Sequence, residues 1–310
     1  MIYSELHRKT GKISKIGLGT VQFGMDYGFT KAKTQDEVNA ILAKSKELGI
    51  NFIDTARAYG DSEEKIGRYL KVNRGHEYLV ETKIALIKED IAVDKEALRK
   101  HIFASIDTSR NNLGQDKLDI FMSHQSDDYL IENEYFWGAV REAREKGSFG
   151  HFGVSFYDTE QAEKVLKSRA AEVDFVQVPY NVFDQRFESV FPKFRDKGIN
   201  VVTRSVFLKG IVAVDNSRVP AELKDILVYK NRLADIAKDT GLSNTELALL
   251  FVISSPAVHT TIIGTDSSKE IELNAAILEK IEKIKAAHKE MKSLNIKDRS
   301  LIDPRRWKQL

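Results

Sequence analysis

The chain has 310 residues, of which 42% are hydrophobic and 30% are charged, a composition that suits a folded protein with a large core and not a disordered chain. Its 48 Lys and Arg residues nearly balance its 46 Asp and Glu residues, so it lacks the basic field that nucleic acid or an anionic membrane requires, and neither partner is expected. The absence of cysteine excludes disulfides, thiolate metal sites and cysteine nucleophiles, and with no long apolar run it predicts a cytoplasmic location.

The first predicted element is a β-hairpin at residues 1–14. Two short alternating runs flank a turn at Thr10-Gly11. We expect this hairpin to be structural and to close the bottom of the barrel that the rest of the chain predicts.

Short runs of β-forming residues then alternate with helical patterns. Eight such runs centre on residues 16–18, 52–54, 79–83, 120–124, 152–155, 175–178, 201–204 and 261–263. The segments between them, such as residues 35–48 and 95–113, place apolar residues three and four positions apart, as amphipathic helices do. Eight strand–helix repeats predict an α/β fold, namely a (β/α)8 TIM barrel.

Two regions depart from this rhythm. Residues 215–230 have no strong strand signal and are expected to form an excursion after the seventh strand. Residues 298–310 form a tail whose Arg305, Arg306 and Trp307 either cover the barrel mouth or lie frayed at the surface.

No linker rich in Gly, Ser or Pro divides the chain, so residues 1–310 are predicted to form a single domain. No histidine or carboxylate pattern has ligand spacing, and no metal site is predicted.

Four residues with acid–base chemistry lie at the ends of successive predicted strands. Asp54 ends the second strand and Tyr59 follows it on a loop, while Lys83 and His124 end the third and fourth strands. Each residue also has a purely structural alternative. Asp54 could cap a helix, Tyr59 could pack in the loop, Lys83 could be a surface lysine, and His124 could be a strand-end histidine whose hydrogen bonds are made within the protein. Because barrel enzymes hold their active sites at the carboxyl ends of the strands, the shared placement favours one site.

With these motifs in order, the chain resembles the aldo-keto reductase family over nearly its whole length. The matching segments are Gly17-Leu18-Gly19-Thr20, Phe52-Ile53-Asp54-Thr55-Ala56 with Tyr59-Gly60 and Ser62-Glu63, Glu81-Thr82-Lys83, the strand ending in His124, Gly153-Val154-Ser155, Gln177 with its neighbours, and Gly264-Thr265 through Asn274. The resemblance implies reversible reduction of an aldehyde or ketone by hydride transfer from a nicotinamide cofactor.

The resemblance also implies a role for each of the four residues. Tyr59 is expected to be the general acid, because a phenol with a pKa of about 10 holds a proton at neutral pH. Lys83 is expected to lower that pKa toward the working range, with Asp54 balancing its charge. His124 is expected to donate a hydrogen bond to the carbonyl oxygen of the substrate.

The implied cofactor is NADP(H), with NAD(H) as the second choice. Ser155 and Gln177 match the residues that bind the nicotinamide carboxamide, and Phe156 stands where the family usually has asparagine. Arg204 replaces an aromatic that commonly stacks on the nicotinamide ring, and its guanidinium suits either that ring or an anionic group of the substrate. The other candidates for cofactor binding are Gly19, Thr20, Asp54, Ser205, Phe207, Leu208, Gly210, Gly264, Thr265, Asp266, Lys269, Glu270 and Asn274.

The segment that starts at Gly264 opens a predicted helix whose free N–H groups suit a phosphate. Family members that select NADPH tend to carry basic side chains here, whereas this chain has Asp266 and Glu270 around Lys269. Acidic residues suit the ribose hydroxyls of NADH instead, so both cofactors stay open.

The substrate pocket is expected to include Gln22, Phe23, Tyr27, Phe156 and Tyr157. For Phe23 and Tyr27 packing within the loop is an equal alternative. A mixture of polar and aromatic side chains suits a hydroxylated small carbonyl compound, such as a sugar or keto-sugar.

Two other functions suit the same barrel. One is a nicotinamide-binding regulatory or sensor subunit with little turnover, since some relatives act as ion-channel β subunits and can retain the same four residues. The other is a Schiff-base aldolase with Lys83 as the nucleophile, against which Tyr59, Gln177 and the segment at Gly264 count.

Overall fold

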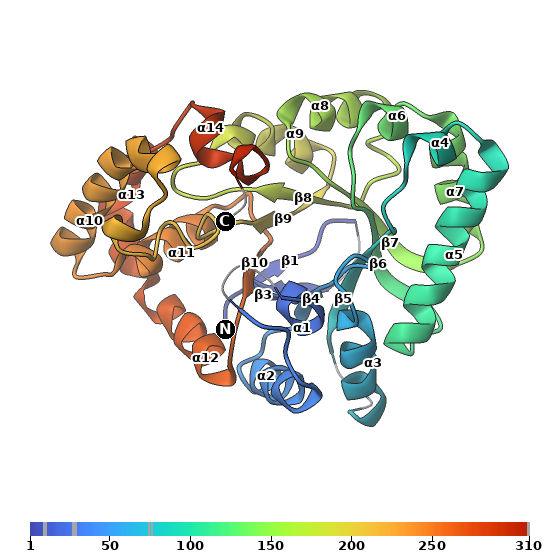
Figure 1. Ribbon diagram of the computed structural model, residues 1–310, viewed down its shortest axis with the longest axis horizontal. Coiled ribbons are helices and arrows are strands. Elements are labelled where there is room, and N and C mark those ends of the chain that lie inside the picture. The colour runs from blue at the N-terminus through green and yellow to red at the C-terminus, as the bar shows by residue number, and fades with distance from the viewer. Residues whose placement is uncertain (9–10, 27–29, 74, 76, 309–310) are drawn as a thin grey trace.

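The computed structural model describes residues 1–8, 11–26, 30–73, 75 and 77–308. Eight parallel strands close into a barrel in the order β10-β3-β4-β5-β6-β7-β8-β9, which confirms the predicted TIM barrel (Figure 1). The strands are β3 (Ile16–Gly19), β4 (Phe52–Asp54), β5 (Leu79–Lys83), β6 (Leu118–Ser123), β7 (Phe149–Ser155), β8 (Phe175–Pro179), β9 (Asn200–Arg204) and β10 (Thr260–Gly264). Each overlaps the run that predicted it.

The last strand closes the barrel by pairing on both sides. Thr261 of β10 pairs with Ile16 of β3, and Thr260 pairs with Val202 of β9. Nearly all strand positions are buried, because one face of each strand fills the barrel and the other packs under the helices. The strands therefore appear in the sequence as largely apolar runs that end in polar residues at the barrel mouth.

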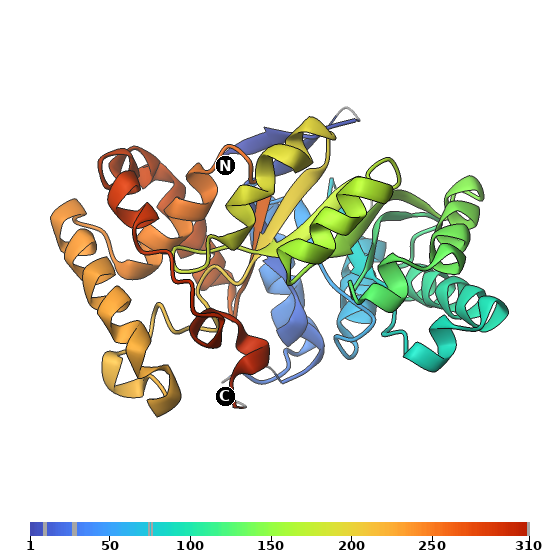
Figure 2. The same cartoon turned by 90° about the horizontal axis from the view of Figure 1, so that it is seen from above.

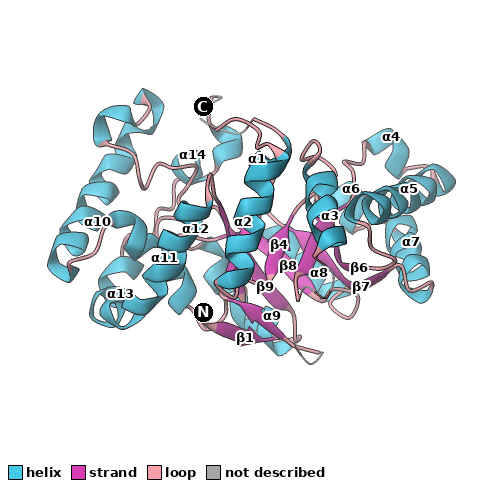
Figure 3. Cartoon of the chain, turned by 90° about the horizontal axis from the view of Figure 1, so that it is seen from below, coloured by secondary structure: helices cyan, strands magenta, loops and turns pink. Residues whose placement is uncertain are grey.

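Helices surround the barrel (Figures 1 and 3). They are α1 (Val21–Gly24), α2 (Gln35–Glu47), α3 (Ser62–Val72), α4 (Glu89–Ala92), α5 (Lys95–Leu113), α6 (Asp128–Ile131), α7 (Glu134–Glu145), α8 (Thr159–Ser168), α9 (Phe191–Asp196), α10 (Leu227–Thr240), α11 (Asn244–Ser254), α12 (Ser268–Ala276), α13 (Ile284–Lys292) and α14 (Arg299–Ile302). Local capping sets their starts: Thr34 and Glu37 form a capping box at α2, and Asp94 caps α5. The helices predicted at 35–48 and 95–113 are confirmed.

Short 3-10 helices occupy several connections. They are η1 (Arg186–Ser189), η2 (Asn216–Arg218), η3 (Ala221–Ile226), η4 (Ile277–Lys283) and η5 (Pro304–Arg306). The predicted excursion after β9 contains η2 and η3 and leads into α10. Within the described ranges, no helix combines the length and the apolar character needed to cross a membrane.

The amino-terminal hairpin closes one end of the barrel. It pairs β1 (Tyr3–Glu5) with β2 (Lys12–Ser14), and Thr10 of its predicted turn lies outside the described residues. Ile13 of β2 packs against side chains of the barrel interior, including Phe52 and Phe175. The predicted closing role of the hairpin is confirmed.

The carboxyl-terminal segment lies at the opposite end from the hairpin, as Figure 2 shows. It comprises α14, η5 and Trp307, whose side chain is buried and donates a 2.9 Å hydrogen bond from its indole N–H to the Ser300 carbonyl. Pro304 reaches the cavity described below. Of the two alternatives for the tail, packing near the barrel mouth holds for the described residues up to 308.

Candidate active site

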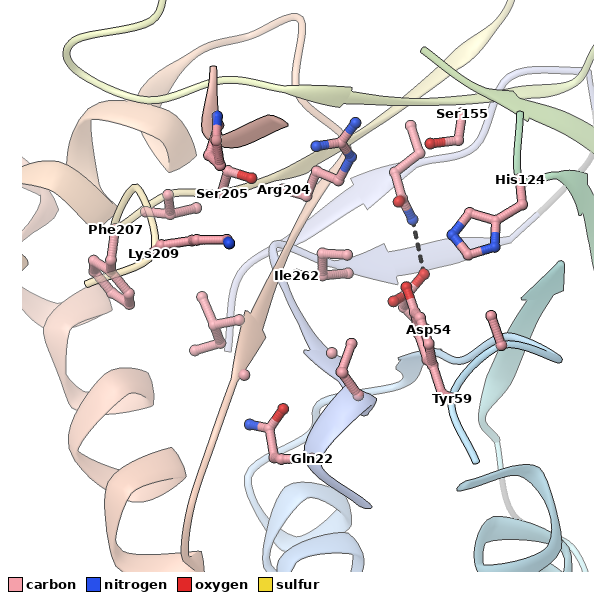
Figure 4. Close-up of a pocket in the computed structure, with 18 of the residues that line it drawn as sticks. Gln22, Asp54, Tyr59, His124, Ser155, Arg204, Ser205, Phe207, Lys209 and Ile262 are labelled. Atoms are coloured by element: carbon pink, nitrogen blue, oxygen red, sulfur yellow. Dashed lines mark hydrogen bonds between the residues drawn. The ribbon is translucent and has the colours of Figure 1, made fainter. Parts of the chain in front are cut away.

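A cavity of about 510 Å³ lies at the carboxyl ends of the strands. Asp54, Tyr59 and His124 line one side of it, and Figure 4 shows their side chains close together. The other predicted residues that line it are Gly19, Gln22, Ser155, Gln177, Arg204, Ser205, Phe207, Gly210 and Gly264. The barrel therefore brings side chains from many strand ends to one opening.

Lys83 lies behind this cavity, in the barrel interior, with its side chain fully buried. Its ammonium forms an ion pair with Asp54 and donates a 3.0 Å hydrogen bond to the Thr55 carbonyl. Burial is the largest single influence on the pKa of Lys83 and lowers it, but Asp54, Tyr59 and Glu81 together, with Asp54 foremost among them, hold the pKa above its ordinary value. Lys83 is thus a permanent buried cation next to the cavity.

Tyr59 lies between this cation and the cavity. Its ring centre is 5.4 Å from Lys83 Nζ and 5.9 Å from the centre of the His124 ring, which it meets edge-on. Burial raises the pKa of the phenol above its ordinary value, and the Lys83 charge only partly offsets the rise. The expected net fall of this pKa is therefore wrong, because burial outweighs the ammonium. The phenol holds its proton at neutral pH.

His124 follows β6 and presents a neutral ring to the cavity. Burial, reinforced by the Lys83 charge, lowers its pKa to about 4. Its Nδ1 atom is buried and has no hydrogen-bond partner among the described residues. A neutral imidazole donates from one nitrogen and accepts at the other, so the ring is suited to bind a ligand group in the cavity.

A second carboxyl group, Glu81, lies beside Lys83, and the sequence-based prediction missed its part in the site. Glu81 Oε1 is 3.4 Å from Lys83 Nζ and accepts a 2.6 Å hydrogen bond from the Gln177 amide. The same amide nitrogen donates to Asp54 at 2.7 Å. Burial raises the pKa of Glu81 well above its ordinary value. Strand alternation was the available signal, since Glu81 precedes Lys83 by two residues and so shares its face.

The loop that carries Tyr59 is held from below by Glu63 at the start of α3. This buried carboxylate accepts hydrogen bonds of 2.6 Å from Thr82 and 2.6 Å from Ser109. It also forms an ion pair with Arg57, which lies on the loop itself. The Ser62-Glu63 part of the motif therefore positions the loop.

The same loop is held from the other side by direct backbone contact with α1. Gly60 adopts a φ of +55°, in the left-handed region that favours glycine. A Cβ atom built on Gly24 would lie 1.8 Å from the Tyr59 carbonyl oxygen. Glycine at these two positions allows the two segments to touch and fixes the backbone of Tyr59.

The loop after β9 has a strained backbone next to the cavity. Ser205, Leu208 and Lys209 have φ values of 64°, 47° and 50°, which residues other than glycine adopt infrequently. Ser205 and Lys209 line the cavity, and Leu208 is buried beside it. Strain of this kind, of about 1–3 kcal/mol per residue, is concentrated at ligand sites. The strain therefore marks this loop as a candidate part of a ligand site.

The first turn of α12 already holds a carboxylate. Glu270 accepts a 2.7 Å hydrogen bond from the Asp266 N–H, and its own N–H donates to Ser267 Oγ at 3.2 Å. The Asp266 side chain accepts a 2.9 Å hydrogen bond from Thr30. An acidic side chain thus occupies a backbone donor that was expected to bind phosphate.

Several predicted residues do not line the cavity. They are Thr20, Lys83, Leu208, Thr265, Asp266, Lys269, Glu270 and Asn274. Thr20 supports the site indirectly, because its hydroxyl donates a 2.8 Å hydrogen bond to the Asp54 carbonyl.

The predicted substrate pocket needs correction. Phe23 and Phe156 do not line it, because both side chains are fully buried in the hydrophobic core. Phe156 follows Ser155, which faces the cavity, and neighbouring residues of an extended chain face opposite sides. Gln22 does line the cavity, and Tyr27 lies outside the described residues.

Tyr157, which the sequence also assigned to the pocket wall, does line the cavity. Pro304 of the carboxyl-terminal segment lines it as well and escaped the sequence-based prediction. Pro304 approaches the cavity only through the packing of the tail, which the sequence does not indicate.

The arrangement suits proton transfer to a ligand oxygen. The Tyr59 phenol and the neutral His124 ring face one cavity, and the buried Lys83 cation lies behind them. Donors and charges fixed in this way stabilise negative charge that develops on an oxygen atom.

Known proteins resemble this chain in sequence and in fold. The family model described as "Aldo/keto reductase family" matches residues 15–296. The L-galactose dehydrogenase of Arabidopsis thaliana is 26% identical over 286 residues, which cover 88% of this chain and 86% of that protein. A probable voltage-gated potassium channel subunit beta of Oryza sativa is 26% identical over 311 residues, which cover 91% and 92%. The solved structure of an aldo-keto reductase from Bacillus halodurans in its holo form superposes with a TM-score of 0.76 and 20% identity, over 99% of this chain and 100% of that one.

Proposed function

The chain belongs to the aldo/keto reductase family, and on that basis we propose that it reversibly reduces an aldehyde or ketone to an alcohol with NAD(P)H. The observation that carries the proposal is the buried Lys83–Asp54 ion pair behind a protonated Tyr59 and a neutral His124. The cofactor, when bound, supplies hydride to the carbonyl carbon.

The protein's own groups act on the carbonyl oxygen. His124 donates a hydrogen bond to that oxygen and orients it, and Tyr59 gives it a proton as negative charge develops there. Lys83 stabilises the phenolate that remains, because the ammonium is fixed 5.4 Å from the ring centre. In the oxidation direction the phenolate takes the proton back from the alcohol.

Several residues are placed to hold the cofactor. Gln177 uses its amide nitrogen for Asp54 and Glu81, so its Oε1 atom is the part left for a carboxamide N–H. Ser155 offers a hydroxyl on the side of the cavity where His124 lies (Figure 4). The strained loop from Ser205 to Gly210 lines the cavity and is proposed to follow the diphosphate.

The carboxylates at the first turn of α12 are the basis of our proposal on cofactor preference. NADP(H) is the form toward which the family resemblance leans, but an added 2′-phosphate at this turn would meet the carboxylates of Glu270 and Asp266. Like charges at short range repel, whereas ribose hydroxyls can donate to carboxylates. This arrangement supports use of NADH as well as, or in place of, NADPH.

The proposed substrate is a small hydroxylated carbonyl compound such as a sugar or keto-sugar. Gln22 places a side-chain amide at the cavity wall, and the Arabidopsis relative is named L-galactose dehydrogenase.

A single domain and a cytoplasmic location are further proposals, and both rest on the sequence alone.

A regulatory subunit with little turnover is the second proposal, because the rice relative is named as a potassium channel subunit. It differs from the first in turnover number, not in the presence of the four acid–base residues.

The experiment is to follow NADH and NADPH absorbance with a reactive aromatic aldehyde for the native protein and for Tyr59→Phe. We expect turnover to fall by about 10²–10⁴-fold in the variant, the usual range for a general acid, with cofactor affinity retained. Tyr135→Phe, at an exposed position of α7, is the matched control. Tight cofactor binding without turnover in the native protein would favour the regulatory subunit, and absence of cofactor binding would reject both proposals.

A further inference from the structure

Two cationic side chains, Arg204 and Lys209, line the candidate active-site cavity. Arg204 donates one hydrogen bond, of 3.1 Å, to the Phe156 carbonyl. Within the part of the chain that the structure describes, no carboxylate lies within ion-pair distance of either side chain. The cavity therefore carries positive charge that the described side chains leave uncompensated.

The Arg204 guanidinium is held in place by Tyr157. Its central carbon lies 3.9 Å from the centre of the Tyr157 ring, while that of Arg305 lies 4.1 Å from the same centre. Two guanidinium groups that close cannot share one face of a ring, so they lie on opposite faces. Planar guanidinium groups stack favourably on aromatic faces, and the stack limits the motion of Arg204.

The two arginines on this ring differ in their charge partners. Arg305 donates to Asp303 at 2.9 Å from Nε and also pairs with Asp158 at 3.2 Å. Arg204, which lines the cavity, has no such partner among the described residues. Two of its three nitrogen atoms are without a hydrogen bond to the described chain, and a planar fork of N–H donors matches a carboxylate or phosphate.

The two cations of the cavity occupy different places. In Figure 4, Arg204 lies between Ser205 and Ser155, on the side of His124, whereas Lys209 lies beside Phe207. The charge of Arg204 contributes to lowering the pKa of His124, after burial and Lys83, which is consistent with this proximity. Lys209 is thus part of the loop proposed for the diphosphate, whereas Arg204 lies toward the reacting groups.

We propose that Arg204, stacked on Tyr157, binds an anionic group of the substrate, so that the preferred substrate is an aldehyde or ketone bearing a carboxylate or phosphate. The inference rests on the proposed reductase function and narrows its substrate class. The anionic group takes no part in bond changes, since hydride still goes to the carbonyl carbon and the Tyr59 proton to its oxygen. An acidic or phosphorylated sugar satisfies this requirement and the one for hydroxyl groups.

The test compares carbonyl compounds that differ in charge. One pair is 4-carboxybenzaldehyde and its methyl ester, and the other is glyceraldehyde 3-phosphate and glyceraldehyde. For each pair the ratio of kcat/KM, charged over neutral, is measured for the native protein and for Arg204→Gln. We expect a native ratio of about tenfold or more in at least one pair, and a fall toward one in the variant, since hydrogen bonds to charged groups are stronger than those between neutral groups. The pair that responds identifies carboxylate or phosphate.

Two variants make the result specific. Arg204→Lys keeps the charge without the planar fork and should retain part of the preference. Lys209→Gln removes the other cation and should raise KM for the cofactor. The ratio of kcat/KM, charged over neutral, should stay within about twofold of the native one, because a cation that contacts only the cofactor affects both substrates of a pair alike. A native ratio near one in both pairs, or a ratio unchanged by Arg204→Gln, overturns the inference.

A binding measurement separates this inference from the reductase proposal. The affinities of benzoate, inorganic phosphate and neutral benzamide are measured by calorimetry with the cofactor-loaded protein. Turnover of the neutral aldehydes without any anion preference would leave the reductase in place and reject the anion site. Weaker benzoate or phosphate binding in Arg204→Gln, in a protein with no turnover, would support the anion site and reject the reductase.

Discussion

Gln177 donates a 2.7 Å hydrogen bond from its side-chain amide to Asp54, and this bond links β8 to β4 across the interior of the barrel. The Asp54 oxygen that accepts it also pairs with the Lys83 ammonium. A strand on the far side of the barrel therefore helps to fix the ion pair on which Tyr59 depends. The charges and hydrogen bonds of this interior are the basis of the first two predictions.

The Asp54→Asn substitution should destabilise the protein strongly, because it removes the nearer and ionised of the two carboxyl groups beside the buried Lys83 ammonium and leaves only Glu81, 3.4 Å away. Removing one partner of a buried pair typically lowers the free energy of unfolding by about 3–5 kcal/mol. The double substitution Asp54→Asn with Lys83→Met should recover much of the stability and none of the turnover. Urea unfolding and a reductase assay measure both effects. Glu47→Gln, which breaks an exposed pair with Lys44, should change stability by less than about 1 kcal/mol.

Stability should depend on pH through Glu81. Its pKa is raised in the folded protein, whereas in the unfolded chain it is about 4.3. The stabilisation from holding this proton is complete below about pH 4.3 and is lost as pH rises toward the folded value. Glu81→Gln has no such proton to lose, so its stability relative to the native protein should rise with pH, by up to about 1.4 kcal/mol per unit between pH 5 and 7.

Urea unfolding of native and variant proteins at several pH values measures this slope. Glu64→Gln, at an exposed position on α3, is the control and should give a flat difference. A flat difference for Glu81→Gln as well would mean that Glu81 is ionised in the folded protein.

Replacing Glu270 with glutamine should raise the affinity for NADPH relative to the affinity for NADH. In Glu270→Gln the side chain can still accept a hydrogen bond from the Asp266 N–H, but its negative charge is gone. The affinity for NADPH should rise by about two- to fivefold, since exposed charge pairs contribute up to about 1 kcal/mol, and the affinity for NADH should change little. Fluorescence titration of both cofactors measures this. Glu272→Gln, exposed on the same helix, should leave the ratio of the two affinities unchanged, and an equal gain in both variants would argue against a 2′-phosphate at this turn.

A methyl group at Gly24 should disrupt the site without touching a catalytic side chain. The Cβ of Gly24→Ala would meet the Tyr59 carbonyl oxygen at 1.8 Å, so α1 and the loop must separate. We expect a loss of about 1–3 kcal/mol in the free energy of unfolding and a large drop in kcat. Gly138→Ala, on α7 with no neighbouring atom within 4 Å of the new Cβ, should instead stabilise by about 0.5–1 kcal/mol. Thermal unfolding and turnover of the pair distinguish a local clash from a general effect of the substitution.

The strand ends were predictable because each acid–base residue stands next to a run of β-forming residues, and barrel topology brings such ends together. The hydrogen bond from Gln177 to Glu81 was not predictable in this way, since it joins residues 96 positions apart through the barrel interior. The stacking of Tyr157 between two arginines depends likewise on how the tail packs.

Burial explains the two kinds of error. The Tyr59 pKa was expected to fall, because the sequence indicates which charges are near but not how completely water is excluded. Phe156 was assigned to the cavity because the strand end was located to within a residue, and one residue decides which side a side chain faces. Both errors concern solvent contact and not the order of the elements.

The hairpin of β1 and β2 packs Ile13 into the amino end of the barrel. Both ligands of the proposed reaction are therefore left with the mouth at the other end as the common way in and out. Side chains fill the barrel interior as well, so the closed end offers no second route. If one ligand of the proposed reaction binds deeper in the shared cavity than the other, it would bind first and leave last, and its release would contribute to the time of each turnover.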